Sequence, residues 1–194
     1  DRPVEFAMYS GYQSRRTRRH YGVDWSLMDD VIDLGMAGYG FNRGQVQDTV
    51  EALPNTPFKG GEMWYLHYRS DATPAPKTEI WCNRLLRQYL FSGCVGCHIW
   101  RLSAMDGGSF YQTSRATAIM QEYAEFFKQE QRCDEKLQVE GLKRDRWIAF
   151  EHDGKICVVL MSFQRDPGEA TVTVEGREFD REIEPYGTDI FIVD

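Results

Sequence analysis

The chain lacks any long hydrophobic run. In its 194 residues the longest uninterrupted apolar run is Ile156–Met161, far short of the roughly 20 residues that a membrane-spanning helix needs. No charged-then-apolar signal segment opens the chain, which starts at Asp1 rather than Met. We therefore expect a mature product or a fragment that has no membrane partner and is cytoplasmic, with a secreted or periplasmic location left open.

Cysteines are few and their number is odd. The five are Cys82, Cys94, Cys97, Cys133 and Cys157. An odd count in a chain of this size does not indicate a disulfide framework, so reduced thiols are the better expectation.

Positive charge is also scarce. The chain has 23 Lys and Arg against 30 Asp and Glu, a net charge of -7, and an acidic surface disfavours binding to phosphate backbones. We therefore expect no nucleic-acid partner. The one basic cluster combines Arg15, Arg16, Arg18 and Arg19 with His20. It could hold phosphate or another anion, but a solvated loop or helix face is the more common meaning of such a cluster.

What the chain does have is a globular composition, with 42% hydrophobic and 27% charged residues. Its first two-thirds alternates strand-like and helix-like segments. The expected strands are 4–9, 33–39, 58–65 and 94–102, and the expected helices are 45–53, 78–91 and a segment from Ser114. Asp24 is the expected N-cap of a further short helical segment. Such alternation predicts parallel strands with helical crossovers, an α/β architecture.

Beyond about Cys133 the pattern changes to short strands rich in Val, Ile and Phe. They are expected at 147–151, 155–163, 170–174 and 189–193. Asp153-Gly154 between two apolar runs is a typical hairpin signal. We therefore expect a small antiparallel β domain at this end of the chain.

Glu62 is the carboxylate best placed for chemistry. It lies in the segment Gly60-Gly61-Glu62-Met63-Trp64-Tyr65, at the C-terminal end of an expected buried strand. Ligands of parallel α/β folds meet the carboxyl ends of the strands. Trp64 and Tyr65 offer flat apolar surfaces that suit a sugar ring. The plainer interpretation is a solvent-facing Glu at a strand end.

A second motif points to different chemistry. Cys94-Val95-Gly96-Cys97-His98 matches C-x-x-C-H, the pattern of covalent haem attachment. The motif lies within a strand-like run, and a zinc site would need a second Cys or His pair at useful spacing. Chance occurrence in a buried strand is therefore the favoured interpretation, and we expect no cofactor and no metal.

The order of the pieces resembles the second half of a (β/α)8-barrel glycoside hydrolase, in the clan that contains the family 42 β-galactosidases. The motifs that carry this resemblance are Tyr9-Ser10-Gly11-Tyr12, Tyr21-Gly22-Val23-Asp24-Trp25, Gly38-Tyr39-Gly40-Phe41-Asn42, Gly61-Glu62-Met63 and Gly96-Cys97-His98-Ile99-Trp100-Arg101. The resemblance implies barrel strands five to eight in residues 1–132, followed by a small β-sandwich-like domain in residues 133–194.

The resemblance also implies roles for particular residues. Glu62 would be the catalytic nucleophile of a retaining β-glycosidase, such as a β-galactosidase. Trp100 would form the floor of the sugar site and Tyr39 would hold the nucleophile. Trp64, Tyr65 and Arg101 would complete the substrate-binding set. For Trp100 and Tyr39, core packing is an equally good interpretation.

The chain departs from this family in one respect. Retaining hydrolysis needs a second carboxylate about 5–5.5 Å from the nucleophile, and in this clan it follows an Asn at the end of strand four. The chain contains no Asn-Glu dipeptide. The acid/base residue is therefore unassigned, and the expected partners are a carbohydrate substrate and a missing N-terminal half-barrel, with a homo-oligomer possible. The alternative is a non-catalytic carbohydrate-binding or scaffolding module.

Overall fold

A computed structural model gives the structure of the chain. It describes residues 6–38, 48–63, 79–92, 96–100 and 106–194, and for residues 38, 58–63, 92, 96–100 and 129 it describes the backbone alone. The chain divides into two compact units. The first unit comprises residues 1–73 and 91–105, and the second unit comprises residues 74–90 and 106–194.

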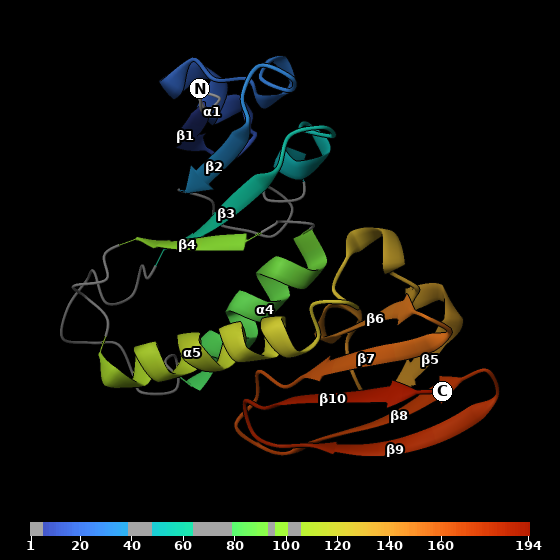
Figure 1. Ribbon diagram of the computed structural model, residues 1–194. Helices are drawn as coiled ribbons and strands as arrows, with labels where there is room; N and C mark the ends of the chain where they lie inside the picture. Colours follow the sequence, from blue (N-terminus) through green and yellow to red (C-terminus); the bar gives the residue numbers. More distant parts are fainter. Residues whose placement is uncertain (1–5, 39–47, 64–78, 93–95, 101–105) are drawn as a thin grey trace. The chain divides into compact units, whose positions relative to one another are not determined.

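The first unit contains a four-stranded parallel sheet in the order β1-β2-β3-β4 (Figure 1). Its strands are β1 (Ala7–Gly11), β2 (Leu34–Gly38), β3 (Phe58–Met63) and β4 (Gly96–Trp100). Helix α1 (Arg15–Tyr21) and the 3-10 turn η1 (Trp25–Leu27) connect β1 to β2. The buried core that supports this sheet consists of Tyr12, Val23, Trp25, Ile32, Ala37 and Leu53.

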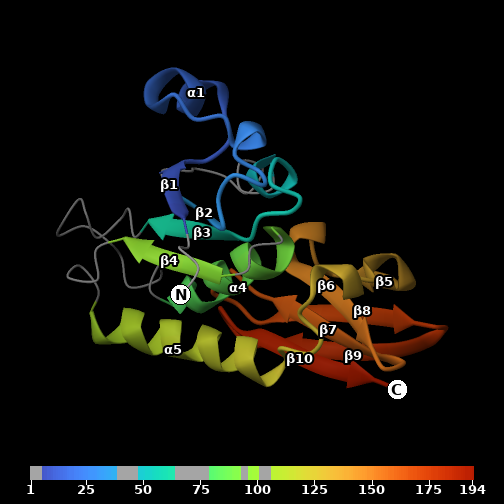
Figure 2. The ribbon, with the colours of Figure 1, turned by 45° about the horizontal axis from the view of Figure 1, so that its top comes forward.

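The second unit combines two helices with six strands. Helices α4 (Trp81–Ser92) and α5 (Gly107–Glu122) lie next to each other in both views (Figures 1 and 2), and the Trp81 indole donates to Thr113 Oγ1 over 2.9 Å. The strands form two antiparallel sheets in the orders β10-β7-β6 and β5-β8-β9. They are β5 (Leu137–Glu140), β6 (Trp147–His152), β7 (Lys155–Met161), β8 (Gly168–Val174), β9 (Arg177–Ile183) and β10 (Thr188–Val193).

The two antiparallel sheets share one apolar core. Alternation along the strands sends Val158 and Leu160 of β7 and Val172 and Val174 of β8 into the same buried cluster. Ile183 of β9 also belongs to this cluster and is fully buried. Two 3-10 turns, η3 (Gln129–Gln131) and η4 (Asp134–Lys136), connect α5 to β5, and a third, η5 (Arg144–Arg146), lies between β5 and β6.

The expected fold class, half of a (β/α)8 barrel (strands five to eight) followed by a small antiparallel β domain, is wrong. Six of the ten described strands belong to small antiparallel sheets. Within the residues that the structure describes, the regular alternation of one strand with one covering helix is also not seen. Helix α1 has seven residues, and the described part of the β2–β3 connection contains only four helical residues, 48–51. Most of α4 and all of α5 belong to the second unit. Apolar periodicity predicted these helices but could not indicate which sheet they pack against.

Asn83 of α4 forms hydrogen bonds with the turns that connect strands of the second unit. Its side chain is 1% exposed. The Nδ2 group faces three backbone oxygens, those of Ser162 at 2.6 Å, Gly187 at 2.9 Å and Tyr186 at 3.1 Å. Its Oδ1 accepts a hydrogen bond from Thr188. One buried amide thus satisfies polar groups from two separate turns.

Gly141→Ala is expected to destabilise the second unit by about 2–5 kcal/mol, through backbone strain and overpacking. Gly141 has a φ of +84° and follows β5, and a Cβ there would lie 2.3 Å from the backbone oxygen of Glu169. Urea unfolding followed by circular dichroism measures the loss.

The matched control for this prediction is Gly176→Ala. Gly176 has a φ of +79°, and a Cβ there meets nothing within 4 Å. This variant carries the left-handed strain alone and should lose about 1–2 kcal/mol. Equal losses in the two variants would contradict a role for the contact between Gly141 and Glu169.

Candidate functional site

The carboxyl ends of the four parallel strands form one edge of the first unit's sheet, which we call the carboxyl edge. Gly11 of β1 pairs with Gly38 of β2. On the neighbouring pair of strands, Glu62 pairs with Ile99 and Met63 pairs with Trp100. Ligands bind outside the carboxyl ends of the strands in open α/β sheets, so this edge is the first place to look for a site.

The register places Glu62 and Trp100 one position apart on adjacent strands at this edge, and the alternation of the strands puts the two residues on opposite faces of the sheet. The other expected site residues, Tyr39, Trp64, Tyr65 and Arg101, lie outside the described residues. The described backbone therefore places two of the six expected residues at the carboxyl edge without bringing them onto one face, and the assignments of all six stay predictions.

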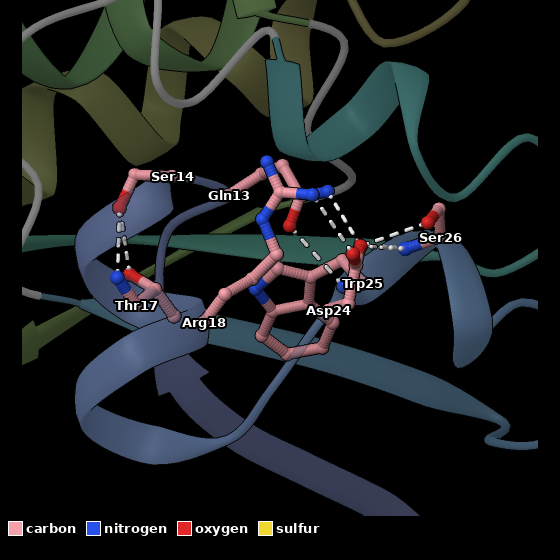
Figure 3. Close-up of polar contacts among 7 residues, drawn as sticks. All are labelled: Gln13, Ser14, Thr17, Arg18, Asp24, Trp25 and Ser26. Atoms are coloured by element: carbon pink, nitrogen blue, oxygen red, sulfur yellow. Dashed lines mark hydrogen bonds and ion pairs between the residues drawn. The ribbon is translucent and has the colours of Figure 1, made fainter.

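A polar cluster occupies the segment that follows β1 at the carboxyl edge (Figure 3). Asp24 is its centre. Oδ1 of Asp24 accepts from Gln13 Nε2 at 2.8 Å and from Ser26 Oγ at 2.8 Å, and Oδ2 accepts from Arg18 at 3.1 Å. Ser26 also donates its backbone N–H to Asp24, which makes Asp24 the N-cap of η1, as expected from the sequence.

These contacts keep the Asp24 carboxylate ionised. The hydrogen bonds from Gln13 and Ser26, with a smaller contribution from Arg18, lower the pKa of Asp24 to about 2. A carboxyl group that is fully ionised at neutral pH and already bonded on both oxygens is unsuited to act as a general acid. Asp24 therefore shapes the edge and does not supply the acid that a retaining glycosidase needs.

Trp25 fixes this segment to the sheet. Its ring is fully buried, and its indole N–H donates to the backbone oxygen of Gly11 over 2.8 Å. Gln13 accepts from the backbone N–H of Trp25 at 3.2 Å and donates its own backbone N–H to Thr49 at 2.7 Å. The segments that follow β1 and β2 are thus joined beside the carboxyl edge.

Asp24→Asn is expected to weaken this segment by about 1 kcal/mol at pH 6, the usual effect of losing a charged cap. The folded-state pKa of about 2 lies below the unfolded value of about 3.9. The contribution of the carboxylate is therefore complete above about pH 4 and is lost as the pH falls through about 2. The difference in the free energy of unfolding between the chain and this variant, measured in urea, should shrink from pH 6 to pH 3.

Asp166→Asn serves as its control, because Asp166 is exposed in the second unit. A pH-independent difference for Asp24→Asn would contradict the role given to its charge.

The C-x-x-C-H motif is only partly described. Cys94 lies outside the described residues, whereas Cys97 and His98 belong to β4. Among the described residues no group of three or more His, Cys, Asp or Glu side chains could hold a metal ion. The thiols of Cys82, Cys133 and Cys157 are free and buried. Burial raises their pKa values to about 11, 11 and 12, so they stay protonated at neutral pH.

A groove that sequence reasoning missed lies in the second unit. It has a volume of about 660 Å³ and is lined mainly by charged and polar side chains. The lining residues are Glu79, Gln112, Arg115, Arg165, Glu184, Pro185, Tyr186 and Gly187. They come from four segments that are far apart in the chain, and none of these segments carries a motif. No signal in the sequence could have found this groove.

Comparison with known proteins identifies no family. No family model matches the chain, and no curated protein matches it. Within the described residues, no helix is both long and apolar enough to cross a membrane.

Proposed function

We propose that the chain is a glycoside hydrolase that acts on a β-glycoside such as a β-galactoside, with Glu62 as its nucleophile. The observation that carries this proposal is the place of Glu62, which is the last residue but one of β3 and lies at the carboxyl edge of a parallel sheet. Ligands meet this edge in parallel α/β sheets, and a carboxylate held there can attack the anomeric carbon of a glycoside.

In the proposed reaction, Glu62 attacks the anomeric carbon and the bond from this carbon to the leaving oxygen breaks. A second carboxylate protonates that oxygen and later takes a proton from the water that releases the sugar. Asp24 is unsuited to the acid role because its pKa is about 2. We propose that another segment, on the same precursor or on a separate chain, supplies the acid.

The experiment that tests the nucleophile avoids the need for an acid. A 2,4-dinitrophenyl leaving group departs without protonation, and a 2-fluoro substituent on the sugar slows release of the covalent intermediate. The chain is incubated with 2,4-dinitrophenyl 2-deoxy-2-fluoro-β-galactoside and with its glucoside. The expected result is one equivalent of dinitrophenolate and a mass increase on the peptide that contains Glu62.

A non-catalytic carbohydrate-binding module is the second candidate. The low pKa of Asp24 favours this binding module, because the Asp24 carboxylate at the carboxyl edge cannot donate a proton at neutral pH. Saturable binding of galacto-oligosaccharides without any covalent label would favour this candidate and overturn the hydrolase. A label on a residue other than Glu62 would overturn the assignment of the nucleophile.

A further inference from the structure

The exposed side of α1 carries a dense group of positive charges. We call Arg15, Arg16 and Arg19 the basic face, and all three are exposed. Among the described residues none of the three has a carboxylate partner. Arg18, in contrast, is paired with Asp24 at 3.1 Å. Three exposed guanidinium groups on a seven-residue helix contrast with a chain whose net charge is -7.

This arrangement opposes the stability of the helix. Arg15 and Arg19 are four positions apart and Arg16 and Arg19 are three apart, so their side chains are neighbours on the helix surface and repel each other. Arg15 and Arg16 also lie in the first turn, which contains no acidic residue. Positive charge there opposes the helix dipole. An anion bound at the basic face would relieve both effects.

The helix is held in place by contacts on its other side. The side chain of Ser14 accepts from the backbone N–H of Thr17 at 3.0 Å and caps the helix. Thr17 is buried, and a Cβ on Gly11 would lie 2.8 Å from its Oγ1. With Arg18 bound to Asp24, these contacts hold the helix that carries the basic face, so its backbone need not be ordered when a ligand binds.

The basic face lies beside the proposed site. Gly11 is the last residue of β1, and its contact with Thr17 places α1 directly against the carboxyl edge. Tyr21, at the end of α1, is 54% exposed and also approaches Gly11. One strand, β2, separates β1 from β3, so β3 lies about 10 Å from β1 across the sheet. The register places Glu62 on the face opposite to the one on which Gly11 meets α1, so an oligosaccharide that reaches both passes over the carboxyl edge.

We propose that the basic face binds the carboxylate or sulfate groups of an acidic oligosaccharide, with Tyr21 against a sugar ring. This inference rests on the proposed function and narrows its substrates to anionic glycans. Guanidinium groups suit this ligand because they form paired hydrogen bonds with carboxylate and sulfate oxygens.

The test compares two probes that differ only in charge. One is a hexasaccharide of alternating β-glucuronate and N-acetylglucosamine, and the other is the same hexasaccharide with its carboxyl groups reduced to alcohols. Binding of each is measured by calorimetry to the chain and to the variant Arg15→Gln/Arg16→Gln/Arg19→Gln. A control variant, Lys128→Gln/Lys143→Gln/Lys155→Gln, removes the same charge from exposed positions of the second unit.

The acidic probe is expected to bind the chain at least about tenfold more tightly than the reduced probe, and added salt should weaken it. The arginine variant should lose this preference, and the lysine variant should keep it. Equal affinity for the two probes would overturn the proposal. Tighter binding of a single-stranded hexanucleotide than of the acidic probe would also overturn it, in favour of nucleic acid.

Covalent labelling of Glu62 by the neutral fluoroglycoside is also measured on the arginine variant. This measurement distinguishes a failure of the anion site at the basic face from a failure of the proposed hydrolase activity. Retained labelling together with equal binding of both hexasaccharides would refute the basic face and leave the hydrolase intact. Absent labelling in the unaltered chain would refute the hydrolase, whatever the basic face binds.

Discussion

Glu62→Ala is expected to lower kcat for 2,4-dinitrophenyl β-galactoside by roughly 10⁴-fold or more, the usual loss when a catalytic nucleophile is removed. The leaving group needs no acid, so the loss reports the nucleophile alone. KM is not expected to rise in proportion, because the carboxylate acts on the anomeric carbon in the transition state. The rate of dinitrophenolate release is the measurement.

Added azide provides a readout that a structural defect would not give. In Glu62→Ala the missing carboxylate leaves space for azide, which attacks the anomeric carbon from the same face and expels dinitrophenolate. The product is a glycosyl azide of inverted configuration, identifiable by nuclear magnetic resonance. Glu51→Ala, which changes an exposed Glu of the same unit, should behave as the unaltered chain. Near-normal turnover by Glu62→Ala without azide would refute the assignment.

Asn83→Asp is expected to lower the free energy of unfolding of the second unit by about 3–5 kcal/mol at neutral pH, the range measured when a buried charge is left without a partner. The amide donates toward the backbone oxygens of Ser162, Tyr186 and Gly187. A carboxylate in its place would direct negative charge at three acceptors, with only Thr188 able to donate. Urea unfolding followed by circular dichroism measures the loss.

The pH dependence of this loss has a definite sign. Burial beside carbonyl oxygens would raise the folded-state pKa of the new carboxyl group above its unfolded value of about 3.9. The penalty should therefore be smallest below about pH 4 and should grow as the pH rises. Gln164→Glu makes the same change from amide to acid at an exposed position near the same turns and should change stability little. A constant penalty from pH 3 to pH 7 would show that the amide is not the cause.

The strands of the second unit were the most predictable part of the fold. Expected strands at 147–151, 155–163, 170–174 and 189–193 correspond to β6, β7, β8 and β10. Asp153 and Gly154 form the expected two-residue hairpin, with positive φ at both positions. These predictions succeeded because apolar alternation and turn residues are local signals. Strand β9 escaped notice because its sequence, REFDREI, has only two apolar residues.

Helix boundaries and packing partners were less predictable. The expected helix from Ser114 begins earlier, at Gly107 of α5, because the Asp106 side chain caps the helix by accepting from the backbone N–H of Ser109. The N-cap hydrogen bond thus offsets the low helix propensity of Gly107 and Gly108. Residue propensities alone would not have predicted a helix start at this position. The apolar face of α4 was evident, but periodicity does not say which sheet it covers. That choice rests on Asn83 and on other contacts across the chain.

The sequence predicted the location of the candidate site, at the carboxyl edge of the parallel sheet, but not the arrangement of its side chains. Sequence pointed to strand ends and to Glu62, and the parallel register places Glu62 and Trp100 at this edge but on opposite faces of the sheet. The cluster around Asp24 was foreseen as a cap but not as a set of bonds to Gln13 and Arg18, because these depend on how the β1–β2 connection folds back. The basic cluster, expected to be a solvated loop or helix face, is an exposed helix beside this edge.

The division of the chain has a consequence for its synthesis. Each unit is built from two separated stretches, 1–73 with 91–105 and 74–90 with 106–194. As the chain leaves the ribosome, the parallel sheet cannot gain β4 until residue 100 has emerged, by which time α4 is already exposed with its packing partners unmade. Helix α4 cannot complete its packing until Ser162 and Gly187 have been synthesised, because Asn83 of α4 donates hydrogen bonds to their backbone oxygens. Its apolar face is therefore the surface most in need of protection during synthesis, and no single cut can release either unit as a continuous piece.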